Sequence, residues 1–298
     1  EDEMFGSCRV SAFRVAHVRW LSNDVAPILD PQRLIMSLQA CAPSMASSLR
    51  SQGYWTNFQS EINDAILPRT VIEAMREQSI RMQRNQRFEP SWSERWDDAT
   101  GTMVRLEKKG VWACEPDGSD YEMAPDILSY MATMISTLPS LLNEFINSMD
   151  QGKGKCLNLS DQMFNAKLAV TSSGGSKYPL HIDNTIGITG SPKDDTRKLT
   201  CILYLNPNYQ EGDGGHLRLL LLHGKCLDLD PRGGRLVIFW SDEIPHEVLP
   251  CKPDSTDAAF DRYALTIWLP DNDPRNIHSI GSKFQDLRQS AFDTDHVC

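Results

Sequence analysis

The feature that most constrains the fold is a series of short apolar runs in the second half of the chain. They lie at 164–172, 178–183, 199–206, 216–222, 224–230, 235–240, 246–250 and 262–269. Glycine, asparagine, aspartate and proline separate the runs, as in strands that are joined by tight turns. Eight short strands at close intervals are typical of a jelly roll. We therefore expect a double-stranded β-helix, jelly-roll or cupin-like, as the core.

The first half of the chain is predicted to be mainly helical. In DILSYMATMISTL (126–138) the apolar residues recur with helical spacing and form a wide stripe. Pro139 is expected to end or kink this helix, and SLLNEFINSMD (140–150) continues as helix. A second helix is predicted after Pro68, whereas residues 89–123 are expected to be loops and irregular strands. The predicted fold class is α+β, with the helices packed on the outer face of one sheet.

Three parts are expected along the chain. Residues 1–150 form a helical and irregular support region that packs on the barrel. The turn-rich segment DQGKGK (150–155) marks the boundary to the barrel core, which covers residues 151–275. Residues 276–298 are expected to be a polar C-terminal tail.

Two histidines and one aspartate are candidate metal ligands. In a strand, residues i and i+2 point to the same side, so His181 and Asp183 can turn toward one ion. His246 follows 63 positions after Asp183, beyond the buried strand of residues 236–240, and the fold must bring it back. Two imidazoles and one carboxylate on one face of an octahedron leave positions open for a co-substrate and O₂, as in non-haem Fe(II) sites.

Arg262 is a candidate carboxylate-binding residue. It opens the strand RYALTIWLP and shares a face with Ala264, Thr266 and Trp268. An inward arginine is costly unless a carboxylate pairs with it. A bidentate pair with a dicarboxylic acid would remove that cost.

The chain resembles the Fe(II)- and 2-oxoglutarate-dependent dioxygenases, which share HxD…H followed by a basic residue on the next strand. More narrowly, it is similar to the prolyl 4-hydroxylases, and most of all to their oxygen-sensing (hypoxia-inducible factor) branch. The motifs that carry the likeness are LTCILYLNPNY (199–209), GDGGHLRLL (212–220), RLVIFWSDEIPHEVLP (235–250) and RYALTIWL (262–269).

This resemblance implies a role for each matching residue. His181, Asp183 and His246 would bind Fe(II). Arg262 would pair with the distal carboxylate of 2-oxoglutarate, and Tyr204 would donate its hydroxyl to the same group. Thr266 is a candidate for a second hydroxyl, and Trp268 would wall the cosubstrate pocket. The implied cofactors are Fe(II), 2-oxoglutarate and O₂, with L-ascorbate as a candidate addition.

The implied reaction is hydroxylation of a C–H bond, with release of succinate and CO₂. The expected substrate is a prolyl residue in a protein or peptide, hydroxylated at C4. Three departures bear on the substrate, namely Thr171 where the branch has a tyrosine, a different loop at 172–177, and an insert at 251–261. Hydroxylation of a free amino acid or other small molecule remains open, and a non-catalytic scaffold is the third alternative.

The net charge bears on the expected partners, and the cysteine content bears on the expected cellular compartment. The net charge is −10, and the basic cluster RMQRNQRF (81–88) fits a solvated helix end, so we expect no nucleic-acid partner. No apolar run has the length of a membrane span, so we expect no membrane partner either. Eight scattered cysteines without a CxxC pair favour a reduced, intracellular protein, cytoplasmic or nuclear. The chain begins at Glu1, which leaves a removed targeting segment as an alternative.

Overall fold

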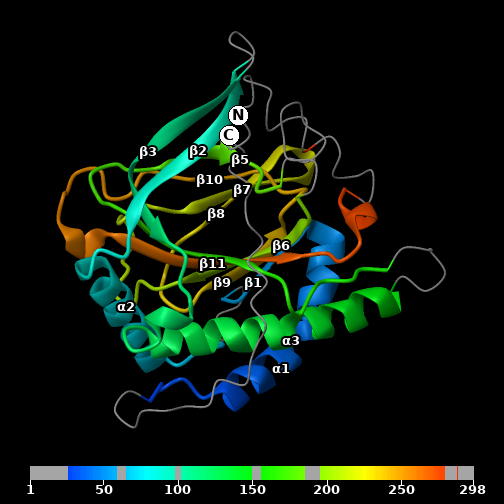
Figure 1. The fold of residues 1–298 in the computed structure, drawn as a ribbon. Coiled ribbons are helices and arrows are strands. Elements are labelled where there is room, and N and C mark those ends of the chain that lie inside the picture. Colours follow the sequence, from blue (N-terminus) through cyan, green and yellow to red (C-terminus); the bar gives the residue numbers. More distant parts are fainter. Residues whose placement is uncertain are drawn as a thin grey trace, which may run out of the picture.

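A computed structural model describes residues 26–58, 65–97, 102–149, 156–184, 195–278 and 287 of the chain. Two antiparallel β-sheets face each other, and the helices cover the outer face of the larger sheet (Figure 1). This is the expected α+β fold, a double-stranded β-helix with supporting helices. The expected boundary at residues 150–155 and nearly all of the expected tail lie outside the described residues.

The larger sheet has seven strands in the order β1-β9-β6-β11-β4-β3-β2. In chain order, these strands are β1 (Tyr54–Thr56), β2 (Glu89–Asp97), β3 (Thr102–Cys114), β4 (Asn165–Thr171), β6 (Arg197–Tyr204), β9 (Leu236–Trp240) and β11 (Arg262–Pro270). The central strands β6, β9 and β11 are almost entirely buried. Their apolar composition follows from this position, because helices cover one face and the second sheet covers the other.

The smaller sheet has four strands in the order β5-β10-β7-β8. They are β5 (Tyr178–His181), β7 (Leu217–Leu221), β8 (Lys225–Leu229) and β10 (His246–Val248). His246 lies between His181 on one neighbouring strand and Leu219 on the other. This register brings together two histidines that are distant in sequence.

Three helices support the larger sheet, namely α1 (Pro31–Gln52), α2 (Arg69–Arg84) and α3 (Pro125–Met149). Helix α1 begins with an Asp30 side chain that accepts from the Gln32 backbone N–H, and it ends at Gly53 with a positive φ of 88°. Short 3₁₀ turns lie at Gly118–Asp120, Leu222–Gly224, Ala258–Phe260 and Pro274–Asn276. Within the described residues, no helix is long and apolar enough to cross a membrane.

One expectation for the first half was wrong. The segment 89–123 was expected to be loops and irregular strands, but most of it forms the β2–β3 hairpin, which extends the larger sheet beyond β4. Its alternation is masked by charged residues and by a register shift between Pro90 and Trp92. Pro139 lies inside α3 and does not end it, and the helix continues to Met149, as expected for the segment that follows this proline.

The cysteines depart from expectation at one position. Five described cysteines form no disulfide, namely Cys41, Cys114, Cys156, Cys201 and Cys251. Cys226 on β8 is disulfide-bonded. The expectation of a fully reduced protein therefore fails at Cys226, because scattered spacing in a sequence does not reveal which thiols meet.

Candidate metal centre and carboxylate pocket

The three predicted ligand residues lie together between the two sheets. One ligand atom from each of His181, Asp183 and His246 lies within 4.8 Å of the other two. The Nε2 atoms of His181 and His246 are 3.6 Å and 3.8 Å from Asp183 Oδ1. Strand β5 ends at His181, so Asp183 follows the strand instead of continuing it. Its carboxylate still turns toward the two imidazoles.

Backbone contacts fix which nitrogen each imidazole offers. The Nδ1 atoms of His181 and His246 lie 2.9 Å and 3.1 Å from the carbonyl oxygens of Pro179 and Ile244. A neutral imidazole that donates from Nδ1 has its lone pair on Nε2, and a hydrogen bond of this kind also fixes the ring. Both Nε2 atoms are therefore oriented toward the Asp183 carboxylate as a metal site requires.

The environment of His246 favours its neutral form. Burial lowers the pKa of His246 to about 4, and the neighbouring His181 acts in the same direction. The ring of Phe239 packs edge-on against His246 with 4.7 Å between centroids. Neutral imidazole is the form that binds a metal ion, so His246 has its lone pair available at neutral pH.

Asp183 is held by the larger sheet. Thr200 Oγ1 on β6 and Trp268 Nε1 on β11 donate to Asp183 Oδ2 at 2.7 Å and 2.9 Å, which leaves Oδ1 facing the imidazoles. Burial acts to raise the pKa of Asp183, but His246, His181 and Arg197 outweigh it and hold this pKa below its ordinary value. The carboxylate is therefore ionised.

The donor set fits a divalent transition metal. Two imidazoles and one carboxylate on one side leave further coordination positions open. Each imidazole Nε2 lies 3.6–3.8 Å from Asp183 Oδ1, and all three ligand atoms lie within 4.8 Å of one another, so an inward movement would bring each to roughly 2.0–2.2 Å from an ion. Metal binding at these residues remains a prediction.

Arg262 lies on the same face of β11 as Trp268, at the opposite end of the strand. It is only 7% exposed, and its Nε donates to the Gly215 carbonyl at 2.9 Å. One terminal nitrogen donates to the Tyr204 hydroxyl at 3.1 Å. Among the described residues no carboxylate pairs with Arg262. A buried guanidinium without a counter-charge is the arrangement expected for binding an acidic ligand.

A glycine makes room for this arginine. Gly215 has φ +69°, and a Cβ added there would lie 2.9 Å from Arg262 Cδ and 2.9 Å from Cys251 Sγ. The last glycine of GDGG therefore serves two needs, a left-handed backbone and close approach of the arginine stem.

The two remaining predicted residues lie on β11, the strand of Arg262. Thr266 and Trp268 alternate with buried residues on β11 and are half-buried themselves. Trp268 was expected to wall the cosubstrate pocket, and its indole N–H also holds Asp183. Sequence reasoning missed Thr200, although alternation along LTCILYLN places it on the face of Tyr204. It also missed Tyr178, whose ring lies 4.3 Å from the His181 ring.

Two segments that differ from the oxygen-sensing prolyl hydroxylase branch, the loop at 172–177 and the insert at 251–261, contact each other. In the 172–177 loop, the backbone N–H groups of Gly174 and Gly175 donate to the carbonyls of Lys252 and Cys251 in the 251–261 insert. Ser173 also donates to the Asp257 carbonyl at 3.0 Å. The loop and the insert therefore form one surface next to the start of β11.

A second group of possible ligands lies behind β6. Asp242, Glu243 and His278 also bring their ligand atoms within 4.8 Å of one another. His278 follows β11 in sequence, and its backbone N–H donates to Asp242 Oδ2 at 2.6 Å. Lys198 Nζ already lies 2.7 Å from Asp242 Oδ2, with both side chains 0% exposed. We interpret this group as a buried ionic network.

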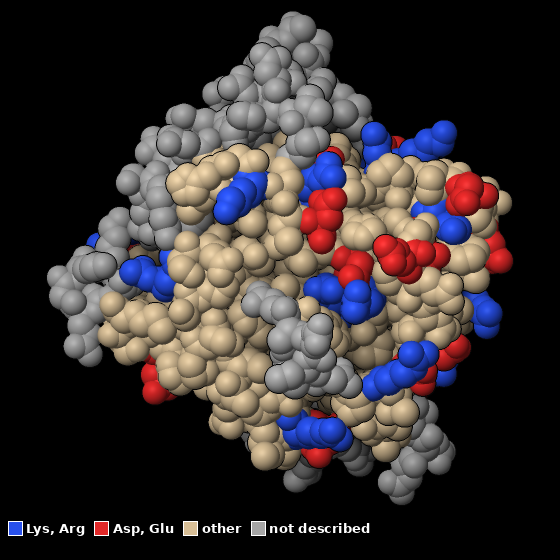
Figure 2. All heavy atoms as spheres, turned by 180° about the vertical axis from the view of Figure 1, so that it is seen from behind, with Lys and Arg blue, Asp and Glu red and all other residues tan. Residues whose placement is uncertain are grey.

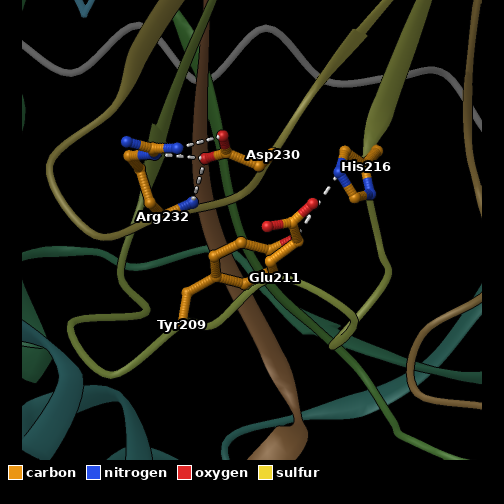
Figure 3. A pocket seen from close by; sticks show the side chains of 5 residues that line it. All are labelled: Tyr209, Glu211, His216, Asp230 and Arg232. Carbon is orange, nitrogen blue, oxygen red and sulfur yellow. Dashed lines mark hydrogen bonds and ion pairs between the residues drawn. The ribbon is translucent and has the colours of Figure 1, made fainter. Parts of the chain in front are cut away.

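A polar hollow of about 510 Å³ lies away from the ligand residues (Figure 3). It is lined by Tyr209, Glu211, His216, Asp230 and Arg232. Arg232 and Asp230 pair with each other at 2.6 Å, and His216 lies 3.4 Å from the Tyr209 hydroxyl. His216 was expected to be an exposed strand end, and it is half-buried instead.

Charged side chains are mixed on the face opposite to the view of Figure 1. Figure 2 shows Lys and Arg side chains next to Asp and Glu on this face. On β7, Arg218 lies 2.8 Å from Asp228 and 3.7 Å from Glu247, which agrees with the solvated role expected for it. Such pairing offsets the local charge.

Comparison with known proteins agrees with the fold. Residues 166–270 match the model of the 2OG-Fe(II) oxygenase superfamily. A hypoxia-inducible factor prolyl hydroxylase of Caenorhabditis elegans is 35% identical over 146 residues, 48% of this chain and 17% of that protein. The human Egl nine homolog 1 is 36% identical over 113 residues, 37% of this chain and 23% of that protein. The chain thus spans less than a third of the length of these two relatives.

Solved structures show the same fold. A Pseudomonas putida prolyl-4-hydroxylase superimposes with a TM-score of 0.57 and 24% identity, over 78% of this chain and 100% of that one. A prolyl hydroxylase of Trichoplax adhaerens, in complex with a hypoxia-inducible factor peptide, has a TM-score of 0.57 and 22% identity, over 84% and 97%. Residues 166–270, the part of the chain that matches the 2OG-Fe(II) oxygenase superfamily model, contain the candidate metal ligands and Arg262.

Proposed function

We propose that this chain is an Fe(II)- and 2-oxoglutarate-dependent dioxygenase that hydroxylates a prolyl residue in a protein or peptide. The observation that carries the proposal is the convergence of two Nε2 atoms and one carboxylate oxygen, with the buried Arg262 on the strand that also anchors Asp183. The Caenorhabditis elegans relative named above is a prolyl hydroxylase, and the match to the superfamily model covers residues 166–270, which include the strands that hold these residues.

Each residue has a defined task in this proposal. His181, Asp183 and His246 would hold Fe(II), which supplies the oxidative chemistry when bound. Arg262 and the Tyr204 hydroxyl would bind the distal carboxylate of 2-oxoglutarate and so orient its keto-acid end toward the ligands. Burial raises the pKa of Tyr204, so its hydroxyl keeps the proton that it donates. Thr266 and Trp268 would complete the wall between the two ends.

The ligand geometry favours an active enzyme over a scaffold. Two aligned imidazole tautomers, a doubly hydrogen-bonded carboxylate and an uncompensated buried guanidinium each cost free energy without a ligand. A scaffold needs none of them.

The test is turnover of 2-oxoglutarate by the Fe(II)-loaded protein with a panel of proline peptides, with and without L-ascorbate. We expect succinate release coupled to a product that carries one added oxygen atom on proline, detected by mass spectrometry. Stimulation only by free amino acids or another small molecule would overturn the peptide substrate and leave the oxygenase. Absence of turnover with every substrate would overturn the activity.

The cosubstrate assignment has its own test. Replacing Arg262 by Leu should weaken 2-oxoglutarate binding by roughly 2–4 kcal/mol, because a buried charge pair is lost. Arg232→Leu, at a paired arginine of the separate hollow, is the matched control. Equal 2-oxoglutarate affinity in the Arg262 variant and the control would show that another residue binds the distal carboxylate.

A further inference from the structure

Two lysines lie on β3 and β4, which follow β11 in the strand order of the larger sheet. Lys108 on β3 donates a hydrogen bond to the Tyr178 hydroxyl, and its Nζ lies 3.8 Å from the centre of the Tyr178 ring. That ring packs against His181. Lys167 on β4 lies directly opposite Thr266 in the register with β11. In Figure 1 the β2–β3 hairpin, which carries Lys108, rises from the larger sheet next to β5 and β10.

Neither lysine has a counter-charge of its own. Within the described part of the chain, neither forms an ion pair with a carboxylate. Burial and the charge of Lys167 lower the pKa of Lys108 to about 7, against the attraction of Asp183. The carboxylate of Asp183 is itself committed to the candidate metal site. Lys108 and Lys167 are therefore two half-buried amines in a region that contains too few negative charges to hold both in the charged form.

Binding of a divalent metal ion and 2-oxoglutarate would not remove this excess of positive charge. With a divalent ion on Asp183 and 2-oxoglutarate on Arg262, the charges of these four groups cancel. Lys108 and Lys167 would remain uncompensated next to them. Burial also raises the pKa of Tyr178, so its hydroxyl keeps its proton while its oxygen accepts from Lys108. The O–H then has a donor direction available for a further ligand.

We propose that Lys108 and Lys167 form a carboxylate-binding subsite next to the metal ligands, with the Tyr178 hydroxyl as a third donor. The carboxylate comes from an acidic residue of the substrate or from the keto-acid end of the cosubstrate, and the charge balance favours the substrate. The proposal relies on the proposed function for the identity of these two sources only.

Amine labelling tests the subsite without any enzyme activity. The metal-free protein receives a short pulse of an N-hydroxysuccinimide ester near pH 7.5, and peptide mass spectrometry follows the extent of acylation at Lys108. The probe is acetyl-aspartyl amide, and acetyl-asparaginyl amide is its uncharged control. Lys109, the exposed neighbour on β3, is the internal reference. We expect the aspartyl probe alone to slow labelling of Lys108 several-fold relative to Lys109, and equal labelling with both probes would overturn the subsite.

Charge-removing variants identify the source of the carboxylate. Lys108→Met and Lys167→Met are compared with Lys109→Met as the control and Lys108→Arg as the charge-retaining variant. Loss of one charge-assisted hydrogen bond predicts a roughly ten- to hundredfold change. A higher KM for Asp-containing proline peptides, but not for their Asn counterparts, assigns the subsite to substrate. A higher dissociation constant for 2-oxoglutarate with the Mn(II)-loaded protein assigns it to cosubstrate, and no change in either quantity would overturn the proposal.

Discussion

The buried pair of Lys198 and Asp242 should dominate the stability of the region behind β6. Lys198 Nζ lies 2.7 Å from Asp242 Oδ2, and both side chains are 0% exposed. Lys198→Met leaves the Asp242 carboxylate with the His278 backbone N–H, at 2.6 Å, as its remaining described donor. Removing one partner of a buried pair costs about 3–5 kcal/mol, because the other charge stays buried without compensation.

The chain contains a matched control for this pair. Arg69 Nε lies 2.7 Å from Glu73 Oε1, but these side chains are 65% and 46% exposed. The distance is the same, but this pair is exposed and lies within one helix, so Arg69→Gln should cost at most about 0.5 kcal/mol. Urea unfolding of the metal-free protein, followed by circular dichroism, gives the free energy of unfolding for each variant.

The double variant Lys198→Met/Asp242→Asn separates charge from packing. It should be less destabilised than the sum of the single variants, since neither charge is then left alone. Equal small losses for Lys198→Met and Arg69→Gln would refute the reasoning and would mean that water reaches the buried carboxylate.

Three further predictions concern the candidate site. Thr200→Val removes the 2.7 Å donor to Asp183 and should weaken Mn(II) binding by roughly 10–100-fold, measured by calorimetry; unchanged affinity would show that Trp268 alone suffices. Gly215→Ala should displace Arg262, because the added Cβ lies 2.9 Å from Arg262 Cδ, and 2-oxoglutarate affinity should fall while Mn(II) affinity stays. Because burial lowers the pKa of His246 to about 4 from roughly 6.5 in the unfolded chain, the unfolded state takes up the proton first as pH falls. The metal-free protein should therefore lose stability from pH 6.5 down to about 4, and urea midpoints that are as pH-dependent in His246→Asn would contradict this.

The sequence predicted the strands of the barrel and their inward residues well, since both follow from local periodicity. Alternation within an apolar run determines which face of its own strand a residue is on. This holds for the positions of His181, Asp183, Tyr204 and Arg262, which lie within or next to such runs. The structure brings these residues to one region, whereas their predicted roles as ligands remain to be tested.

Long-range packing limited the remaining predictions. Lys198 lies near the start of a strand, where solvent exposure is the default, but it is 0% exposed because it pairs with Asp242, which also accepts from His278 in the segment after β11. The β2–β3 hairpin escaped notice because its charged residues conceal its alternation. Lys108 was not predicted as a site residue, because its position next to Tyr178 depends on the orientation of this hairpin relative to β5. No local sequence pattern determines that orientation.

The way Asp183 is held has a thermodynamic consequence. Thr200 and Trp268 tie this carboxylate to the larger sheet, whereas His181 and His246 belong to the smaller one. A divalent ion bound to all three would cross-link the two layers of the barrel, so folding and metal binding become linked equilibria. At a free ion concentration of a hundred times its dissociation constant, this linkage adds about 2.7 kcal/mol to the free energy of unfolding. Chelation should then loosen the contact between the sheets before it affects either sheet alone.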